Sequence, residues 1–176
     1  MNFTIKNSLI SVTGSYITTD VQIIDGKIAA IAPNLEIIGT VINGENKLLL
    51  PGFFNAHTHS SEMWQRGVIP PLPLELWLAH LYDFTPLDTE QVYLSALGTA
   101  VETLLSGGTS VVDHLVLIPG QELETIATVV RAYQRVGIRA FIAPLIQDES
   151  LSAGIPNGEL QPNHELYFRS TGETLA

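Results

Sequence analysis

Strand-like runs and helical stripes alternate along residues 53–144, and this order constrains the fold more than any other feature. Short β-rich runs predict three strands, at residues 53–56, 109–116 and 138–144. Apolar stripes at helical spacing predict two helices between them, at residues 86–106 and 121–136. Thr85 supplies an N-cap for the first helix, and glycines follow both helices. Strand, helix, strand, helix, strand at this spacing predicts βαβ units with a parallel sheet.

Residues 1 to about 50 have a different pattern of short strands separated by tight turns. Asp25-Gly26 lies between two β-rich runs, and this dipeptide predicts a hairpin because both of its residues accept positive φ. A second hairpin is predicted from residues 37–42, through Asn43–Asn46, to residues 48–50. This segment shows no recognisable chemistry, and we interpret it as a structural flank.

Composition excludes several classes of function. The chain of 176 residues has 8 basic and 18 acidic side chains, for a net charge of −10. It therefore lacks the cationic surface that nucleic acids and anionic membranes attract, and we expect neither as a partner. It has no cysteine, which excludes disulfides and thiolate metal sites. We find no signal peptide and no membrane span, so we expect a cytoplasmic protein that acts on a small molecule.

The clearest chemical signal is the sequence His57-Thr58-His59, which directly follows the strand predicted at residues 53–56. Residues i and i+2 of a strand point to the same side, so the two imidazoles can converge on one metal ion. Without thiolates, histidine and carboxylate ligands favour zinc, or alternatively iron. The competing interpretation is a pair of ordinary surface or core histidines.

Longer stretches around this motif resemble the amidohydrolase superfamily, in its cytosine deaminase, chlorohydrolase and thioadenosine/adenosylhomocysteine deaminase branch. The stretches are Pro51–His59, Trp64–Gly67, Leu74–Leu78 and Ser106–Asp113. The resemblance implies an α/β fold, namely a (β/α)8 TIM-type barrel of which this chain holds strands one to three. It also implies that residues 1–50 form half of a small β-sandwich and that residues 51–176 form the first βα units of the barrel.

The resemblance further implies a chemistry. His57 and His59 are expected to bind the metal, and metal-activated water is expected to hydrolyse a non-peptide C–N bond, as in deamination of a small N-heterocycle. The family's further metal-binding His, its His/Glu proton-transfer pair and its metal-binding Asp have no matching positions here. We therefore expect the catalytic acid/base residues to lie beyond residue 176 and the isolated chain to be inactive.

Four other residues are candidates for a substrate pocket. Trp64 and Arg66 belong to the loop after the metal motif, where barrel enzymes place specificity residues, and the alternatives are loop packing and a surface ion pair. Asp113 and His114 end the second predicted strand of residues 53–144, so alternation directs one inward and the other toward the helices. Their functional interpretation is a place in the pocket or a role in supporting the metal ligands. Their alternative role is hydrogen bonding to backbone at the strand end.

The end of the chain suggests a second hypothesis. Ser170–Glu173 has the spacing of a capping box, yet the chain stops at Ala176, so we expect a truncated protein. In this alternative, the chain is a catalytically incomplete fragment or subunit that lacks the later barrel strands. It would need a partner chain, and it would self-associate through the exposed barrel edge at its third strand.

Overall fold

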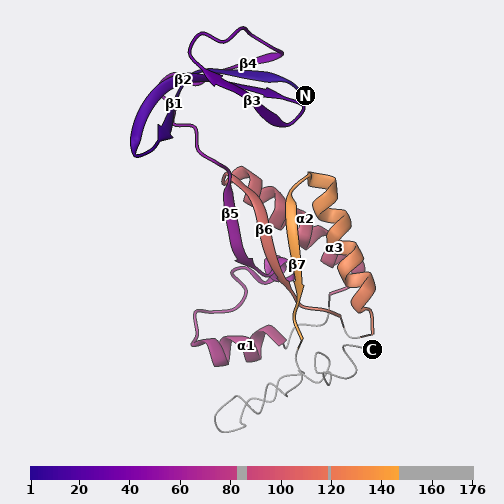
Figure 1. Ribbon diagram of the computed structural model, residues 1–176. Helices are drawn as coiled ribbons and strands as arrows, with labels where there is room; N and C mark the ends of the chain where they lie inside the picture. The colour runs from indigo at the N-terminus through magenta and orange to yellow at the C-terminus, as the bar shows by residue number, and fades with distance from the viewer. Residues whose placement is uncertain (83–86, 119, 147–176) are drawn as a thin grey trace. The chain divides into compact units, whose positions relative to one another are not determined.

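A computed structural model describes residues 1–82, 87–118 and 120–146 of the chain (Figure 1). The chain divides into two compact units, and the boundary falls between Pro51 and Gly52. The first unit is a four-stranded sheet, and the second combines a three-stranded sheet with helices. No helix within the described ranges is long and apolar enough to cross a membrane.

The first unit contains four strands: β1 (Phe3–Val12), β2 (Ser15–Ile24), β3 (Lys27–Ala32) and β4 (Thr40–Asn43). They are ordered β3-β2-β1-β4, and β2 and β3 form the hairpin predicted at Asp25-Gly26, whose φ angles are 49° and 75°. Positive φ at both turn residues is what this turn chemistry requires.

The second predicted hairpin is wrong. β4 pairs with β1 in parallel, and Leu48 forms a further parallel bridge to Leu9. The cause is the second edge of β1, which remains free because β2 pairs along the first edge only. The backbone of Leu9 bonds to Lys47 and Leu49, so both predicted arms run along this edge and do not pair with each other.

The second unit is a partial α/β fold. Its elements are β5 (Phe53–Thr58), the 3₁₀ helix η1 (Ser60–Gln65), α1 (Leu74–Tyr82), α2 (Thr89–Leu105), β6 (Gly108–Leu115), α3 (Glu122–Val136) and β7 (Arg139–Pro144). The sheet order is β5-β6-β7 with both pairs parallel, which confirms the predicted parallel sheet.

Two predicted boundaries need correction. Helix α2 begins at Thr89 and not at residue 86, because Asp88 is the N-cap and forms a capping box with Gln91. The predicted cap Thr85 lies outside the described residues, as does the predicted capping box at 170–173. The strand predicted at 53–56 extends to Thr58, so His57 lies within β5.

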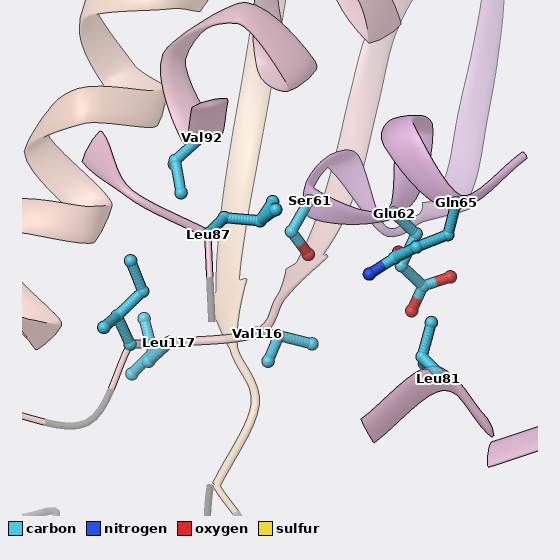
Figure 2. A pocket seen from close by; sticks show the side chains of 9 residues that line it. Ser61, Glu62, Gln65, Leu81, Leu87, Val92, Val116 and Leu117 are labelled. Atoms are coloured by element: carbon cyan, nitrogen blue, oxygen red, sulfur yellow. The ribbon is translucent and has the colours of Figure 1, made fainter. Parts of the chain in front are cut away.

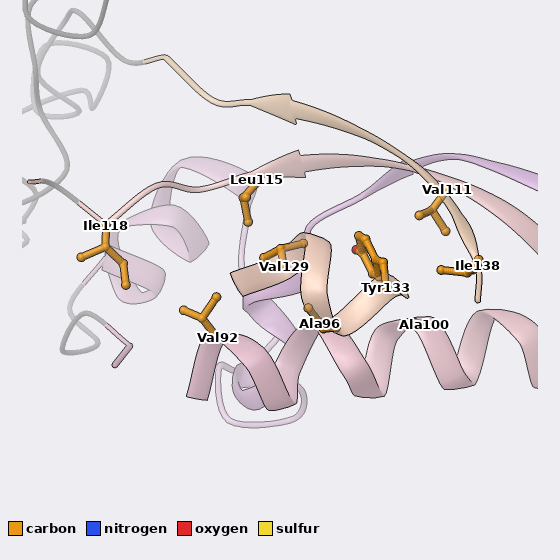
Figure 3. Packing of buried hydrophobic residues seen from close by; sticks show 10 residues of the cluster. Val92, Ala96, Ala100, Val111, Leu115, Ile118, Val129, Tyr133 and Ile138 are labelled. Carbon is orange, nitrogen blue, oxygen red and sulfur yellow. The ribbon is translucent and has the colours of Figure 1, made fainter. Parts of the chain in front are cut away.

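Helices α2 and α3 cover one face of the β5-β6-β7 sheet, and the core lies between these layers (Figure 3). Val111 and Leu115 of β6 are buried against Ala96 of α2 and Val129 of α3. Because side chains alternate along a strand, His114 of β6 points to the opposite face from these residues. The C-terminal ends of β5 and β6 therefore bring the candidate residues together.

Candidate metal centre

The two histidines of the motif converge at the C-terminal end of β5. His57 Nε2 and His59 Nε2 lie 3.1 Å apart, which is a hydrogen-bond distance, and the rings meet edge to face. Two imidazole nitrogens bound to one tetrahedral zinc ion at about 2.0–2.1 Å are about 3.3 Å apart. The observed separation fits that requirement, and the donor set of two neutral nitrogens suits zinc or iron.

A backbone contact fixes the orientation of His59. Its Nδ1 lies 2.8 Å from the carbonyl oxygen of His114, which can only accept a hydrogen bond. Nδ1 therefore carries the proton, and in the neutral ring the lone pair lies on Nε2, which faces His57. A carbonyl that holds the distal nitrogen in this way is the usual support for a metal-binding histidine.

His114 adds a third imidazole to the cluster. Its ring centroid is 4.3 Å from that of His57, and the two planes are tilted by 34°. Of the two residues at the end of β6, His114 is thus the one beside the motif. Even so, no three His, Asp or Glu side chains within the described part of the chain are arranged to hold a metal ion. The described residues bring together two imidazole nitrogens, those of His57 and His59.

Asp113 faces the helices and is fully buried. Its carboxylate accepts hydrogen bonds from Ser60 N at 3.0 Å, Ser60 Oγ at 2.6 Å and Tyr133 OH at 2.7 Å. Burial and the nearby Asp113 charge raise the pKa of Tyr133, so its hydroxyl stays protonated and donates. The sequence predicts that Asp113 lines a pocket. In the structure these donors surround its carboxylate, which has no exposed surface.

Trp64 and Arg66 are both attached to α2. The indole Nε1 of Trp64 donates to the carbonyl of Gln91 at 2.9 Å. The guanidinium of Arg66 forms two hydrogen bonds to the Glu102 carboxylate, at 2.8 and 2.7 Å, and keeps the pKa of Glu102 below its usual value. Arg66 also lines a shallow hollow that His59 borders. These contacts match the loop packing and surface ion pair that the sequence left as alternatives.

A small pocket of about 40 Å³ adjoins the cluster (Figure 2). Glu62 and Gln65 form one side of it, and apolar side chains form the other. The lining residues are Ser61, Glu62, Gln65, Leu81, Leu87, Val92, Val116, Leu117 and Ile118. Glu62 connects the pocket to the histidines, because its Oε1 lies 3.9 Å from His59 Nδ1.

The sequence placed Glu62 and Gln65 in the loop after the histidine motif, where specificity residues are expected, but it named Trp64 and Arg66 as the pocket candidates. Burial raises the pKa of Glu62, although the nearby His59 opposes that shift. Gln65 Oε1 is buried and has no hydrogen-bond partner within the described residues. Glu62 and Gln65 are three residues apart in the sequence. Because a 3₁₀ helix has three residues per turn, this spacing places both side chains on one side of η1.

Comparison with known proteins places these features in context. Residues 48–170 match the amidohydrolase family. Over 110 residues, 62% of this chain, it is 33% identical to 5-methylthioadenosine/S-adenosylhomocysteine deaminase 2 of Archaeoglobus fulgidus. Over 127 residues, 70% of this chain, it is 35% identical to the 5'-deoxyadenosine deaminase of Methanothermobacter thermautotrophicus. The chain spans 26% and 28% of these two relatives.

A solved structure shares the fold. A mutant of atrazine chlorohydrolase from Arthrobacter aurescens TC1, complexed with zinc and atraton, superposes with a TM-score of 0.75. The match covers 98% of this chain and 40% of that chain, at 21% sequence identity. At this identity the similarity concerns the fold alone.

Proposed function

The chain belongs to the amidohydrolase family, and from that premise we propose that His57 and His59 bind a divalent metal ion in a hydrolytic deaminase. The proposed substrate is an adenine nucleoside, since the relatives are named as deaminases of such compounds. In the same proposal, β5, β6 and β7 are the first three strands of a (β/α)8 barrel, and residues 1–50 are half of a small β-sandwich.

One observation carries this proposal, namely the convergence of the two Nε2 atoms at 3.1 Å. Two nitrogens at this separation suit a single ion, and the His114 carbonyl keeps the lone pair of His59 directed toward His57. We propose zinc as the ion, with iron as the alternative, because the chain has no thiolate and both ions accept imidazole. When bound, such an ion supplies activation of water for attack on the carbon of a C–N bond.

We assign the adjoining pocket to the substrate. Its apolar wall, which includes Leu87 and Val92, suits a small apolar group at one edge of a bound substrate. The buried amide oxygen of Gln65 has no partner among the described residues, and it can accept a hydrogen bond from a ligand amine. Arg66 and Trp64 fix the loop that carries these residues to α2.

The direct test is release of ammonia from 5'-deoxyadenosine and 5-methylthioadenosine by the zinc-supplied chain, with His57→Ala as the matched control. Ammonia release that the substitution abolishes supports the deaminase. Zinc binding that His57→Ala removes, without ammonia release, supports a metal site in a catalytically incomplete chain. Zinc binding equal in both proteins contradicts the metal site.

A second candidate function rests on the uncovered sheet. Among the described residues, β5 and β7 each pair only with β6. Phe53, Phe54 and Phe141 are 61%, 54% and 59% exposed, and the last two rings are 5.8 Å apart. We propose that further strands of the same fold cover this face, supplied by a partner chain or a second copy, because open strand edges and apolar rings favour association.

Sedimentation velocity over a range of protein concentrations tests this second candidate. The wild-type chain is expected to associate as its concentration rises, and Phe54→Ser with Phe141→Ser is expected to suppress association. Leu105→Ser is the matched control, since Leu105 is 83% exposed at the end of α2. A wild-type chain that stays monomeric throughout contradicts association through the uncovered sheet.

A further inference from the structure

We propose that Ser60, Asp113 and Tyr133 are positioning residues that hold His59 in the orientation that metal binding requires. The inference rests on the proposed function, because it assigns His59 to a metal. The sequence offered Asp113 as a candidate for the substrate pocket, and it singled out neither Ser60 nor Tyr133. They form one buried hydrogen-bond network directly behind the histidine motif.

The network holds every polar atom of Ser60. Asp113 accepts from its backbone N and its hydroxyl, and the Ser95 hydroxyl of α2 donates to its carbonyl oxygen. Tyr133 of α3 donates to the same Asp113 carboxylate. Ser60, Ser95 and Asp113 are each at most 1% exposed, so water does not compete for these bonds.

The link to His59 runs through two consecutive residues on each side. Asp113 accepts a hydrogen bond from the backbone N of Ser60. The next residue of β6, His114, accepts a hydrogen bond from Nδ1 of His59, the residue that precedes Ser60. The loop is therefore attached to β6 at two adjacent points, one through the backbone and one through the imidazole. Two attachments fix both the position of the His59 backbone and the rotation of its ring.

The composition of the network favours positioning over simple stabilisation. The described residues place no Lys or Arg in an ion pair with Asp113. Buried polar groups seldom add stability beyond that of apolar side chains of similar volume. Their particular contribution is orientation. Each hydrogen bond has a preferred distance and angle, so together the bonds restrict the position and orientation of Ser60.

Single hydroxyl deletions test the inference with little change in packing. Tyr133→Phe and Ser60→Ala each remove one donor to Asp113. Thr125→Val is the matched control, because Thr125 is also a buried hydroxyl of α3 but bonds to the Gln121 carbonyl. All three variants are expected to lower the melting temperature by a few degrees, so stability alone does not distinguish them.

Zinc affinity, measured by competition with a chelating dye, does distinguish them. Tyr133→Phe and Ser60→Ala are expected to weaken zinc binding about 10-fold or more, and Thr125→Val by less than about 2-fold. Equal affinities in the three variants would overturn the positioning role. If His57→Ala leaves zinc affinity unchanged, the proposed metal site fails, and that result is separate from the result for these variants.

A second readout needs no metal. Long-range ¹H–¹⁵N correlation spectra of the neutral imidazoles report which nitrogen of His59 carries the proton. In the metal-free wild type and in Thr125→Val, we expect the proton on Nδ1 alone. In Tyr133→Phe and Ser60→Ala we expect a mixture of the two tautomers. A single tautomer in all four proteins contradicts the inference, whatever the zinc measurement shows.

Discussion

Two buried carboxylates, one in each unit of the chain, are satisfied by different kinds of donor. Asp20 in β2 is 2% exposed and accepts from Lys6 Nζ and from the backbone N of Asn7 and Leu35. Asp113 in β6 is 0% exposed and accepts from the Ser60 backbone and two hydroxyls. The first carboxylate is paired with a cation, whereas the second is bound by neutral donors.

The different donors indicate different roles for the Asp20 and Asp113 networks. The unit around Asp20 contains no histidine, and its carboxylate connects β1, β2 and the segment at Leu35. The network around Asp113 lies beside three imidazoles and restrains the residue that follows His59. We infer that the charged pair serves folding, whereas the neutral network also serves the geometry of the site.

The largest expected effect is that of Asp113→Ala on stability. The substitution leaves two or three buried donors without a partner, which costs about 3–5 kcal/mol of unfolding free energy. Urea denaturation followed by tryptophan fluorescence measures this loss, because both tryptophans lie in the second unit. A loss below about 1 kcal/mol would show that water or other groups replace the carboxylate.

Asp20→Asn is expected to cost less, about 1–3 kcal/mol. The amide oxygen still accepts from one backbone N, and the Lys6 side chain is 24% exposed and can reach water. Amide hydrogen exchange of β2 measures the loss within the first unit. A loss larger than that of Asp113→Ala would reverse the proposed difference between the two networks.

The Asp20 network is expected to depend on pH. The Lys6 side chain, with the backbone N of Asn7 and Leu35, holds the pKa of Asp20 below its ordinary value of 3.8. A carboxyl with a lowered pKa stabilises the folded state above that ordinary value, and the contribution is lost as pH falls below about 4. The protection factors of the β2 amides in wild type should therefore fall below about pH 4, and Asp20→Asn should flatten this dependence. Parallel pH curves would contradict the assignment.

The smallest effect is expected at the surface pair of Arg66 and Glu102. Their side chains are 65% and 48% exposed, so solvent and salt screen the attraction despite two short hydrogen bonds. Glu102→Gln should leave the urea midpoint unchanged within error at physiological salt. A clear loss of stability would give this pair a larger part in holding the loop after the histidines.

Features encoded in short segments could be predicted from the sequence. The parallel sheet follows from alternating periods, and the Asp25-Gly26 turn follows from two adjacent residues. His57 and His59 were identifiable because their spacing of two is itself the signal. The chain's second predicted hairpin failed because the free edge of β1, far away in sequence, pairs with both arms.

The network around Asp113 could not be predicted, because it depends on long-range placement. Ser60 and Asp113 are separated by 53 positions, and Ser60 and Ser95 by 35. Their contact depends on the register between β5 and β6, in which Thr58 lies opposite Asp113. Serine and tyrosine occur widely in helices and loops, so nothing local distinguishes Ser95 or Tyr133 from ordinary polar residues.

X-ray absorption at the zinc edge of the zinc-loaded chain tests the central claim most directly. The claim is that the imidazole nitrogens of His57 and His59, at the end of β5, bind a single metal ion. We expect nitrogen scatterers at about 2.0–2.1 Å with the outer-shell pattern of two imidazoles, reduced to one in His59→Ala. A spectrum with oxygen neighbours only, or one that His59→Ala leaves unchanged, would contradict the claim.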